Sequence, residues 1–252
     1  MIQETTPSHL RYDSPLQEPG RRKRHRTLPG VFPTSKTPRG FIRTRLPLMM
    51  DGLVHIDTDP LVSEILPYAE GLRFWARDGR GNLTVREHVP DLKLVWTDGS
   101  IAFIDYVPLE IQAEMPSFAT RKASLKVSCG ELGASYAVHD ELSIYREPRH
   151  SNLTVMWRHR LDGMDDQAVM AVRKAILRVG LPSSIGTISR VADLRGMRME
   201  WDRAGDIHHL ELIDVDRAFS AIMQLALDGE VEVDISRPLS SSTVVSERGG
   251  QS

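Results

Sequence analysis

Tight-turn dipeptides divide the stretch from residue 61 to residue 108. Asp78-Gly79, Gly81-Asn82 and Asp98-Gly99 separate short runs of apolar and β-branched residues. Such dipeptides accept the positive φ angles of hairpin turns, and short apolar runs between them predict strands rather than helices. The run "IAFIDYVPLEIQ" (101–112) is apolar almost throughout, which is typical of a central strand covered on both faces. We therefore expect hairpin-connected strands here.

Helical patterns flank this stretch. Before it, apolar residues recur at near-helical spacing and stop at Asp59-Pro60, because the residue before a proline avoids the helical region. These residues are Met49, Met50, Leu53, Val54 and Ile56. After it, Ser117 can cap a second helix that ends at Gly133 and has one apolar face. That face contains Phe118, Leu125 and Leu132, and "ASYAVH" (134–139) predicts a further strand. This order predicts an α/β layer ending near Arg160.

A more helical part is expected from residue 161 onward. Asp165 or Asp166 can cap a helix that ends at Gly180. Its apolar stripe contains Ala168, Val169, Val172, Ile176 and Val179. A short helix, a longer helix and a hairpin-like tail follow, which are the parts of a winged helix-turn-helix. We therefore expect a basic, Pro-rich arm at 1–40, an α/β domain at 41–160 and a mostly helical domain at 161–252.

The composition is that of an ordinary globular chain, with 40% apolar and 26% charged residues. No apolar run approaches the ~20 residues that a membrane-spanning helix needs, so we expect no membrane partner. The single cysteine, Cys129, cannot form an intramolecular disulfide and is expected to fill an apolar site in a reducing, cytoplasmic setting. Trp75, Trp96 and Trp157 lie in apolar contexts and are expected in the core.

Positive charge is concentrated at the start of the chain. Residues 1–45 hold ten Arg and Lys against three acids, whereas the remainder holds 22 against 31. The densest part is "RRKRHR" (21–26), which lies between Pro-Gly pairs and is therefore expected to be an exposed arm. Its cations suit nucleic-acid phosphates; they are Arg21, Arg22, Lys23, Arg24 and Arg26. A solvated tail without a partner is the alternative.

Two acids are expected at the tips of adjacent strands. Asp91 follows Pro90 at the start of one apolar run, and Asp105 ends the next run after the Asp98-Gly99 turn. Many metal-dependent nucleases place two carboxylates in this way, but Val107 stands where such enzymes carry a lysine. Taken alone, both acids are explained equally well by turn formation and by capping of backbone amides.

Over residues 29–245 the chain resembles the TnsA family, the endonuclease subunit of heteromeric cut-and-paste transposases. Five elements carry the resemblance, in order and at similar spacing: "GVFPTSKTPRGF" (30–41), "LVHIDTDPLV" (53–62), "VPDLKLVWTDGSIAFIDYVP" (89–108), "ASYAVHDELSIYREPRHSNLTVMWRHR" (134–160) and "AFSAIMQLALDGEVEVDISRPLSSSTVV" (218–245). The resemblance implies a restriction-endonuclease-like core of the PD-(D/E)xK kind, followed by a winged-helix domain. It also implies three partners: DNA, a transposase subunit and the transposition ATPase.

Carried over by residue, the family's metal site is half complete. Asp91 corresponds to the aspartate of the family's Pro-Asp pair and Asp105 to the acid before its lysine, so both become candidate ligands of Mg²⁺. Arg45 stands where the family has a glutamate, and Val107 stands where it has the lysine. A fixed positive charge at position 45 opposes a divalent cation but suits a DNA phosphate. We therefore expect a DNA-binding protein with an impaired nuclease site and no cofactor.

Other side chains could restore the site. Lys93 is expected on the same strand face as Asp91, and Lys122 or Lys126 could reach in from the following helix. Candidate replacement acids are Asp51, Glu64, Glu110 and Glu114. The alternative hypothesis is thus an active endonuclease that cleaves transposon ends with migrated residues and uses Mg²⁺. A DNA-independent interaction protein, such as an antitoxin or a phage assembly factor, is a third hypothesis.

Overall fold

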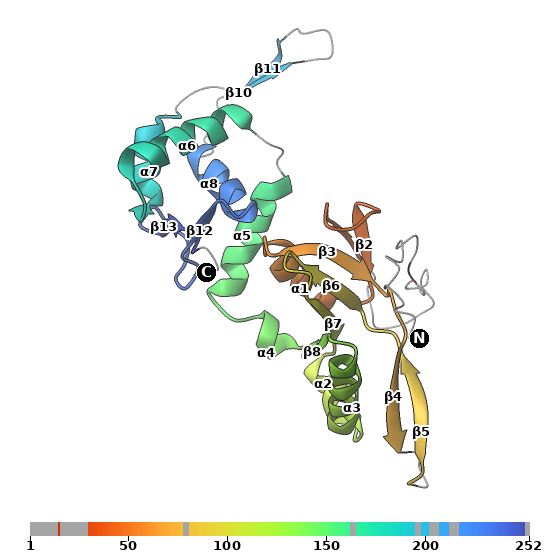
Figure 1. The fold of residues 1–252 in the computed structure, drawn as a ribbon. Helices are drawn as coiled ribbons and strands as arrows, with labels where there is room; N and C mark the ends of the chain where they lie inside the picture. The colour runs from red at the N-terminus through yellow and green to blue at the C-terminus, as the bar shows by residue number, and fades with distance from the viewer. Residues whose placement is uncertain are drawn as a thin grey trace, which may run out of the picture. The chain divides into compact units, whose positions relative to one another are not determined.

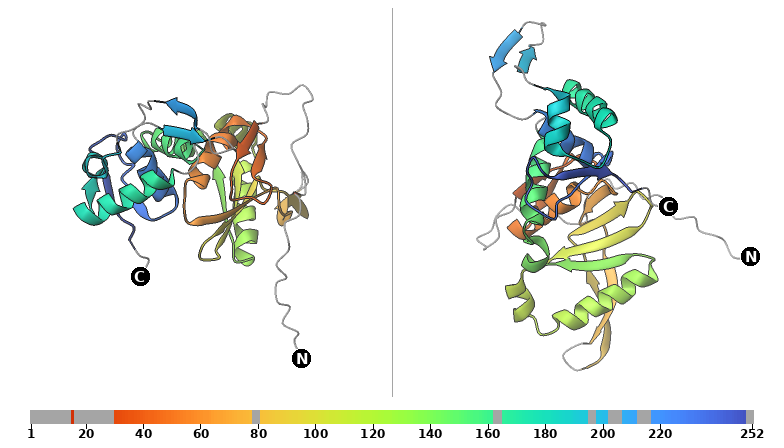
Figure 2. Two further views of the ribbon diagram at one scale, coloured as in Figure 1. Left: turned by 90° about the horizontal axis from the view of Figure 1, so that it is seen from above. Right: turned by 90° about the vertical axis from the view of Figure 1, so that its left-hand side faces the viewer.

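The computed structural model describes residues 15, 30–77, 81–161, 165–194, 198–201, 207–211 and 217–249 (Figures 1 and 2). The predicted arm cations Arg21, Arg22, Lys23, Arg24 and Arg26 lie outside these residues. The chain divides into two compact units. Unit 1 holds Met1–Asp57 and Leu61–Ile144, and unit 2 holds Thr58–Pro60 and Tyr145–Ser252. Both helices and strands are present, so the α/β class is as predicted.

The division after Ile144 falls earlier than the boundary expected near Arg160. The reason is helix α5 (Arg149–Leu161), which packs against helix α8 (Arg217–Leu227) of unit 2. In the sequence, α5 follows the α/β pattern directly and carries no signal of its partner. Packing between residues distant in sequence, rather than the order of elements, therefore sets the boundary.

Unit 1 is built on a four-stranded sheet. Its order is β3 (Val62–Pro67), β6 (Leu92–Trp96), β7 (Ile101–Tyr106) and β8 (Ser135–His139). β7 and β8 are parallel, and the other neighbours are antiparallel. As predicted, β7 is an inner strand, and five of its six residues are buried. Gly99 has a φ of 82° in the turn between β6 and β7, which favours glycine at this position.

Helix α1 (Pro47–Asp57) lies where the first helix is predicted. It packs against β7, against the short helix α4 (Glu141–Ile144), and against a hairpin of β1 (Gly30–Pro33) and β2 (Phe41–Thr44). The close approach depends on Gly52, because a Cβ there would lie 2.0 Å from Cε1 of the fully buried Tyr106. A glycine in mid-helix is unfavourable for helix propensity, but here it lets α1 contact β7.

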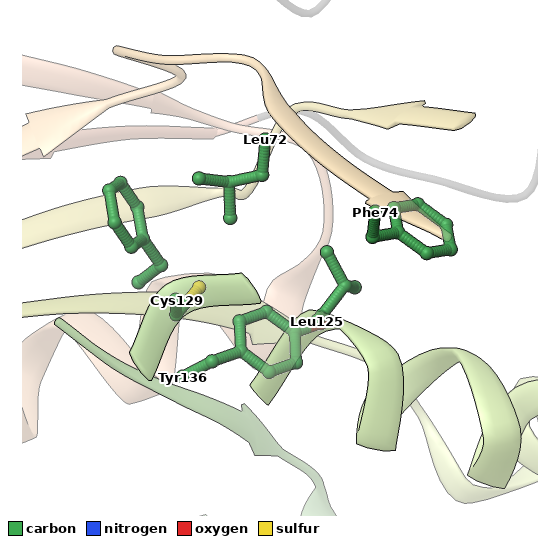
Figure 3. Close-up of a cluster of buried hydrophobic side chains, with 6 residues drawn as sticks. Leu72, Phe74, Leu125, Cys129 and Tyr136 are labelled. Carbon is green, nitrogen blue, oxygen red and sulfur yellow. The ribbon is translucent and has the colours of Figure 1, made fainter. Parts of the chain in front are cut away.

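Two helices connect β7 to β8: α2 (Leu109–Glu114) and α3 (Phe118–Glu131). α3 lies against β8 and against a two-stranded ribbon of β4 (Leu72–Arg77) and β5 (Leu83–His88), which extends from the sheet (Figure 1). Figure 3 shows the buried cluster where these elements meet, with Leu72, Phe74, Leu125, Cys129 and Tyr136 labelled. This cluster fixes the base of the ribbon to the body of unit 1.

Cys129 is fully buried in this cluster, as predicted, and burial raises the pKa of its thiol to about 11. The expected apolar face of α3 is only partly correct. Leu125 is buried, but Leu132 is 68% exposed, because the buried face continues from Leu125 to Cys129, one turn later. The expectation of a core position is wrong for Trp75, which is 60% exposed on the ribbon.

Unit 2 contains α5, α6 (Asp166–Val179), α7 (Ile185–Ala192) and α8. Its three-stranded sheet has the order β12 (Val231–Val233), β13 (Val244–Glu247) and β9 (Ser183–Ser184). A hairpin of β10 (Arg198–Trp201) and β11 (Ile207–Glu211) follows α7 in the chain. As predicted, Asp165 caps α6 by accepting a hydrogen bond from the backbone N–H of Ala168 at 3.1 Å.

The side chain of Asn152, on α5, hydrogen-bonds to the segment that connects β12 and β13. Its Nδ2 donates to the carbonyl oxygens of Ile235 at 3.0 Å and Arg237 at 2.7 Å, while its Oδ1 accepts from the N–H of Leu239 at 3.1 Å. The residue is only 3% exposed, so these bonds replace water for both ends of the amide. Within the described ranges, no helix has the length and apolar character needed to cross a bilayer.

Candidate functional site

The two predicted carboxylates meet where β6 begins and β7 ends. Asp91 directly precedes β6, Asp105 lies in β7, and each residue is 3% exposed. Backbone groups link them: the N–H of Asp91 donates to Oδ1 of Asp105 at 3.1 Å, and the N–H of Tyr106 donates to Oδ2 of Asp91 at 2.8 Å. The antiparallel pairing of β6 and β7, in which Leu92 lies opposite Ile104, therefore brings the two acids together as predicted.

Arg45 forms a two-pronged contact with Asp91. It lies between β2 and α1, and its Nε donates to Oδ1 of Asp91 at 2.5 Å while its Nη2 donates to Oδ2 at 2.7 Å. Nη2 also donates to the carbonyl oxygen of Tyr106 at 2.6 Å. This bidentate geometry is the strong form of an arginine–carboxylate pair. Burial opposes the charge of Arg45, but the bond and charge of Asp91 outweigh it and raise the pKa of the guanidinium.

Asp105 is held by a different set of groups. Nε2 of His88 lies 2.5 Å from Oδ2 of Asp105, and the hydroxyl of Tyr136 donates to the same oxygen. Nη2 of Arg121 lies 2.8 Å from Nδ1 of His88. Because a guanidinium only donates, Nδ1 is the acceptor and Nε2 carries the proton that is shared with Asp105. Burial works against the Asp105 charge, but the bonds from His88 and Tyr136 hold the pKa of its carboxyl below the usual value.

The two acids therefore differ in their electrostatics. Burial raises the pKa of the Asp91 carboxyl, and the hydrogen bond and charge of Arg45 oppose that rise.

The backbone at Tyr68, which is bonded to Asp91, is unusual. The N–H of Tyr68 donates to the carbonyl oxygen of Asp91 at 3.1 Å, and Tyr68 has a φ of 50°. A tyrosine in the left-handed region is uncommon and costs conformational energy. Packing around Asp91 is thus specified closely.

The side chains around Asp91 and Asp105 do not form a suitable Mg²⁺ site. Mg²⁺ takes oxygen ligands in a near-octahedral shell. All four carboxylate oxygens of Asp91 and Asp105 already accept hydrogen bonds, and the guanidinium of Arg45 covers both oxygens of Asp91. Among the described residues, no group of three or more His, Cys, Asp and Glu is placed to hold a metal ion. The predicted replacement acids therefore do not complete the pair; they are Asp51, Glu64, Glu110 and Glu114.

The candidate lysines have separate environments. Lys93 forms an ion pair with Glu70 and is held by that residue rather than by either aspartate. Lys122 lines a small pocket beside Asp105, whereas Lys126 does not line it. The pocket has a volume of about 30 Å³, which is enough to hold ordered water. Its other lining residues are Val107, Met115, Phe118, Arg121 and Tyr136.

Sequence reasoning missed His88, Arg121 and Tyr136. His88 of β5 and Tyr136 of β8 bond Asp105 directly, and Arg121 of α3 bonds His88, so three elements that are far apart in the sequence meet around one carboxylate. The parallel pairing of β7 with β8 could have suggested Tyr136, which lies opposite Phe103, two residues before Asp105. No local spacing rule connects His88 or Arg121 to that strand.

No protein-family model matches the chain, and no curated protein matches it in sequence. The contacts of Arg45, Asp91, His88 and Asp105 are therefore the basis of the functional proposal.

Proposed function

We propose that this protein is a TnsA-like DNA-binding and assembly protein of DNA transposition, with an ion-pair network in place of a catalytic metal site. The observation that carries the proposal is the bidentate hydrogen bonding of Arg45 to Asp91. In an active site of this kind, an acid at position 45 would join Asp91 in binding Mg²⁺. Here the position supplies a cation that occupies the carboxylate instead, so cleavage is not expected.

The order of elements in unit 1 supports the proposed PD-(D/E)xK kind of core. The succession α1, β3, β6, β7, α3 and β8 matches the predicted order of helix, strands, helix and strand. Asp91 directly precedes β6 and Asp105 lies on the adjacent strand β7, the arrangement that a nuclease site on such a sheet requires. Both acids are kept while the groups that would make them catalytic are replaced by Arg45 and Val107.

Unit 2 supports a winged-helix domain used for protein contacts. Helices α6, α7 and α8 are followed by the β12–β13 ribbon, which are the parts of that fold. A helix that reads bases must present side chains to the major groove. α8 instead buries eight of its eleven residues, and His159 of α5 packs edge-on against Phe219 and bonds Ser220 at 3.0 Å. We therefore assign unit 2 to contacts with a transposase subunit or the transposition ATPase.

DNA binding is assigned to the basic arm and to unit 1. In the described residues, Nη1 of Arg45 has no partner and the Arg45 side chain is 39% exposed, so the residue keeps donors for a phosphate while it holds Asp91. Lys122 adds a second cation at the pocket beside Asp105. Arginine and lysine contacts to phosphates position a protein on DNA without reading its sequence.

A salt-titrated binding assay tests this function. The full chain should bind duplex DNA in EDTA at least as well as in Mg²⁺, since no metal takes part and Mg²⁺ competes for the phosphates. Replacing Arg21, Arg22, Lys23, Arg24 and Arg26 by Gln should reduce the steepness of log K against log salt by up to about 4.5, because each of the five phosphate contacts contributes about 0.9. Lys122→Gln should lower it by about 1, and Lys126→Gln, outside the pocket, is the matched control.

Two results would overturn the proposal. If the full chain shows no salt-sensitive DNA binding, a DNA-independent interaction protein becomes the better account. If binding or bending of DNA requires a divalent ion and is lost in Asp91→Asn, the carboxylates coordinate a metal and the active-endonuclease hypothesis gains support.

A further inference from the structure

The outward face of the β4–β5 ribbon carries an unusual set of exposed side chains. Successive outward residues of β4 are Arg73, Trp75 and Arg77, because side chains alternate between the faces of a strand. Opposite them on β5 lie Glu87, Val85 and Leu83. The exposed fractions are 60% for Trp75, 54% for Val85 and 60% for Leu83. The face therefore presents an apolar platform around an indole, with a guanidinium on each side.

The ribbon holds this face on a packed support. On its other side, Leu72 and Phe74 are buried against Leu125 and Cys129 of α3 (Figure 3). The same alternation that buries Leu72 and Phe74 must expose Trp75. The indole is thus displayed by the register of the ribbon and is not a side chain that could turn into the core.

The charged groups on this face are available to a ligand. Nε of Arg73 lies 3.6 Å from Oε1 of Glu87, but the two side chains are 79% and 66% exposed. Such an exposed ion pair adds little stability, so Arg73 can exchange Glu87 for another anion. Arg77 donates to the neutral carbonyl oxygen of Gly81 at 2.8 Å and forms no ion pair with an acid among the residues that the structure describes. Among the described residues of this face, two arginines, Arg73 and Arg77, therefore stand against one acid, Glu87, and the face complements a polyanion.

We propose that this face binds single-stranded DNA, with a base stacked on Trp75 and backbone phosphates at Arg73 and Arg77. This inference rests on the proposed DNA-binding function and adds the strand type and the surface. A duplex presents phosphates, but its base faces are stacked on one another and are not accessible for stacking on an exposed indole. A single strand presents both, and alternating cations and aromatic platforms suit it without reading its sequence.

The test compares a fluorescently labelled oligothymidine with a duplex of equal length, using the full chain. Trp75→Ala should weaken binding of the single strand about fivefold to 150-fold, the loss of one stacked base, and change duplex affinity less than about twofold. Trp75→Phe should restore most of the affinity because it keeps an aromatic face. Arg77→Gln should reduce the salt dependence of single-strand binding by about 0.7 in slope.

Leu132→Ala is the matched control, since Leu132, directly after α3, is 68% exposed and does not belong to the ribbon. It should leave both affinities unchanged. The oligothymidine should also quench tryptophan emission of the wild-type protein more than that of Trp75→Phe, which places the strand on the indole directly. Circular dichroism of each variant confirms that unit 1 remains folded.

The outcomes separate this inference from the function on which it rests. If duplex binds but Trp75→Ala leaves single-strand affinity unchanged, the ribbon inference fails and the proposed function stands. If Trp75→Ala abolishes self-association in sedimentation without changing DNA affinity, the face is a protein interface and the inference fails. If neither form of DNA binds, both proposals fail.

Discussion

Asp91 accepts hydrogen bonds from Nε and Nη2 of Arg45 and, through its backbone N–H, donates to Asp105. One aspartate thus joins the segment before α1 to the two strands that carry the acid pair. The groups that satisfy Asp105 come from the ribbon and from β8. The network therefore ties together the segment before α1, the β6–β7 pair, the ribbon and β8, and it uses the same carboxylate oxygens that a metal would need.

Removing the guanidinium of Arg45 should destabilise the fold, because Asp91 would lose its cation. Arg45→Met leaves a carboxylate that is 3% exposed without its cation, and we expect the free energy of unfolding to fall by about 2–4 kcal/mol. The loss is smaller than for a fully buried pair, because the Arg45 side chain is 39% exposed and solvent screens its charge. Denaturant unfolding measures the change.

The double variant Arg45→Met with Asp91→Asn is the control for that prediction. It removes both charges, so it should recover part of the lost stability. A double variant that loses the sum of the two single losses would show that the two residues are not coupled.

Stability should also depend on pH through Asp105. Its folded-state pKa is lowered by His88 and Tyr136 against the effect of burial, so ionised Asp105 stabilises the fold at pH values above the unfolded pKa of about 3.9. That contribution is lost as pH falls through the folded-state pKa. Burial shifts the pKa of Asp91 in the opposite direction, so Asp91 does not account for this loss.

Urea unfolding of the wild type and of Asp105→Asn between pH 6 and pH 3 measures the effect. The stability of the wild type should decline more steeply on acidification than that of the variant. Equal slopes would mean that Asp105 has the same pKa in the folded and unfolded states.

Gly52 should be intolerant of even one methyl group. Gly52→Ala places a Cβ 2.0 Å from Cε1 of buried Tyr106, so we expect the free energy of unfolding to fall by about 1–3 kcal/mol. Gly130→Ala in α3 is the matched control, because a Cβ there has no atom within 4 Å and helix propensity favours alanine by up to about 1 kcal/mol. Thermal melts should shift in opposite directions; a stabilising Gly52→Ala would contradict the packing of α1 on β7.

Asn152 should be essential for unit 2. In Asn152→Asp a carboxylate oxygen replaces the Nδ2 that donates to the carbonyl oxygens of Ile235 and Arg237. Two carbonyl acceptors then face a charge at a side chain that is only 3% exposed, and we expect a loss of about 2–5 kcal/mol. Hydrogen exchange of the segment between β12 and β13 should rise selectively. The same chemical change at the exposed Asn82 should have little effect, and equal effects of the two substitutions would refute the assigned bonds.

Local sequence signals predicted the elements but not all of their contacts. The Asp98-Gly99 turn fixes the pairing of β6 with β7, and the cap at Asp165 fixes the start of α6, because both depend on neighbours in the chain. Trp75 was misplaced for a physical reason: Phe74 and Trp75 are adjacent and both aromatic, so alternation alone does not say which one faces α3. Only the packing of Phe74 on Leu125 decides it.

The site divides in the same way. The meeting of Asp91 with Asp105 follows from one hairpin, whereas the roles of His88, Arg121 and Tyr136 arise from contacts across the fold. Arg45 was identified by position, but its fork on Asp91 depends on how the segment between β2 and α1 folds over the sheet.

Nicking of supercoiled plasmid by the full chain with Mg²⁺ or Mn²⁺ tests the central claim most directly, with Asp91→Ala and Asp105→Ala prepared in parallel. The ion-pair network predicts no nicking by any of the three proteins, under conditions in which the wild type binds the plasmid. Nicking by the wild type that disappears in both variants would contradict it, because the carboxylates would then hold a catalytic metal.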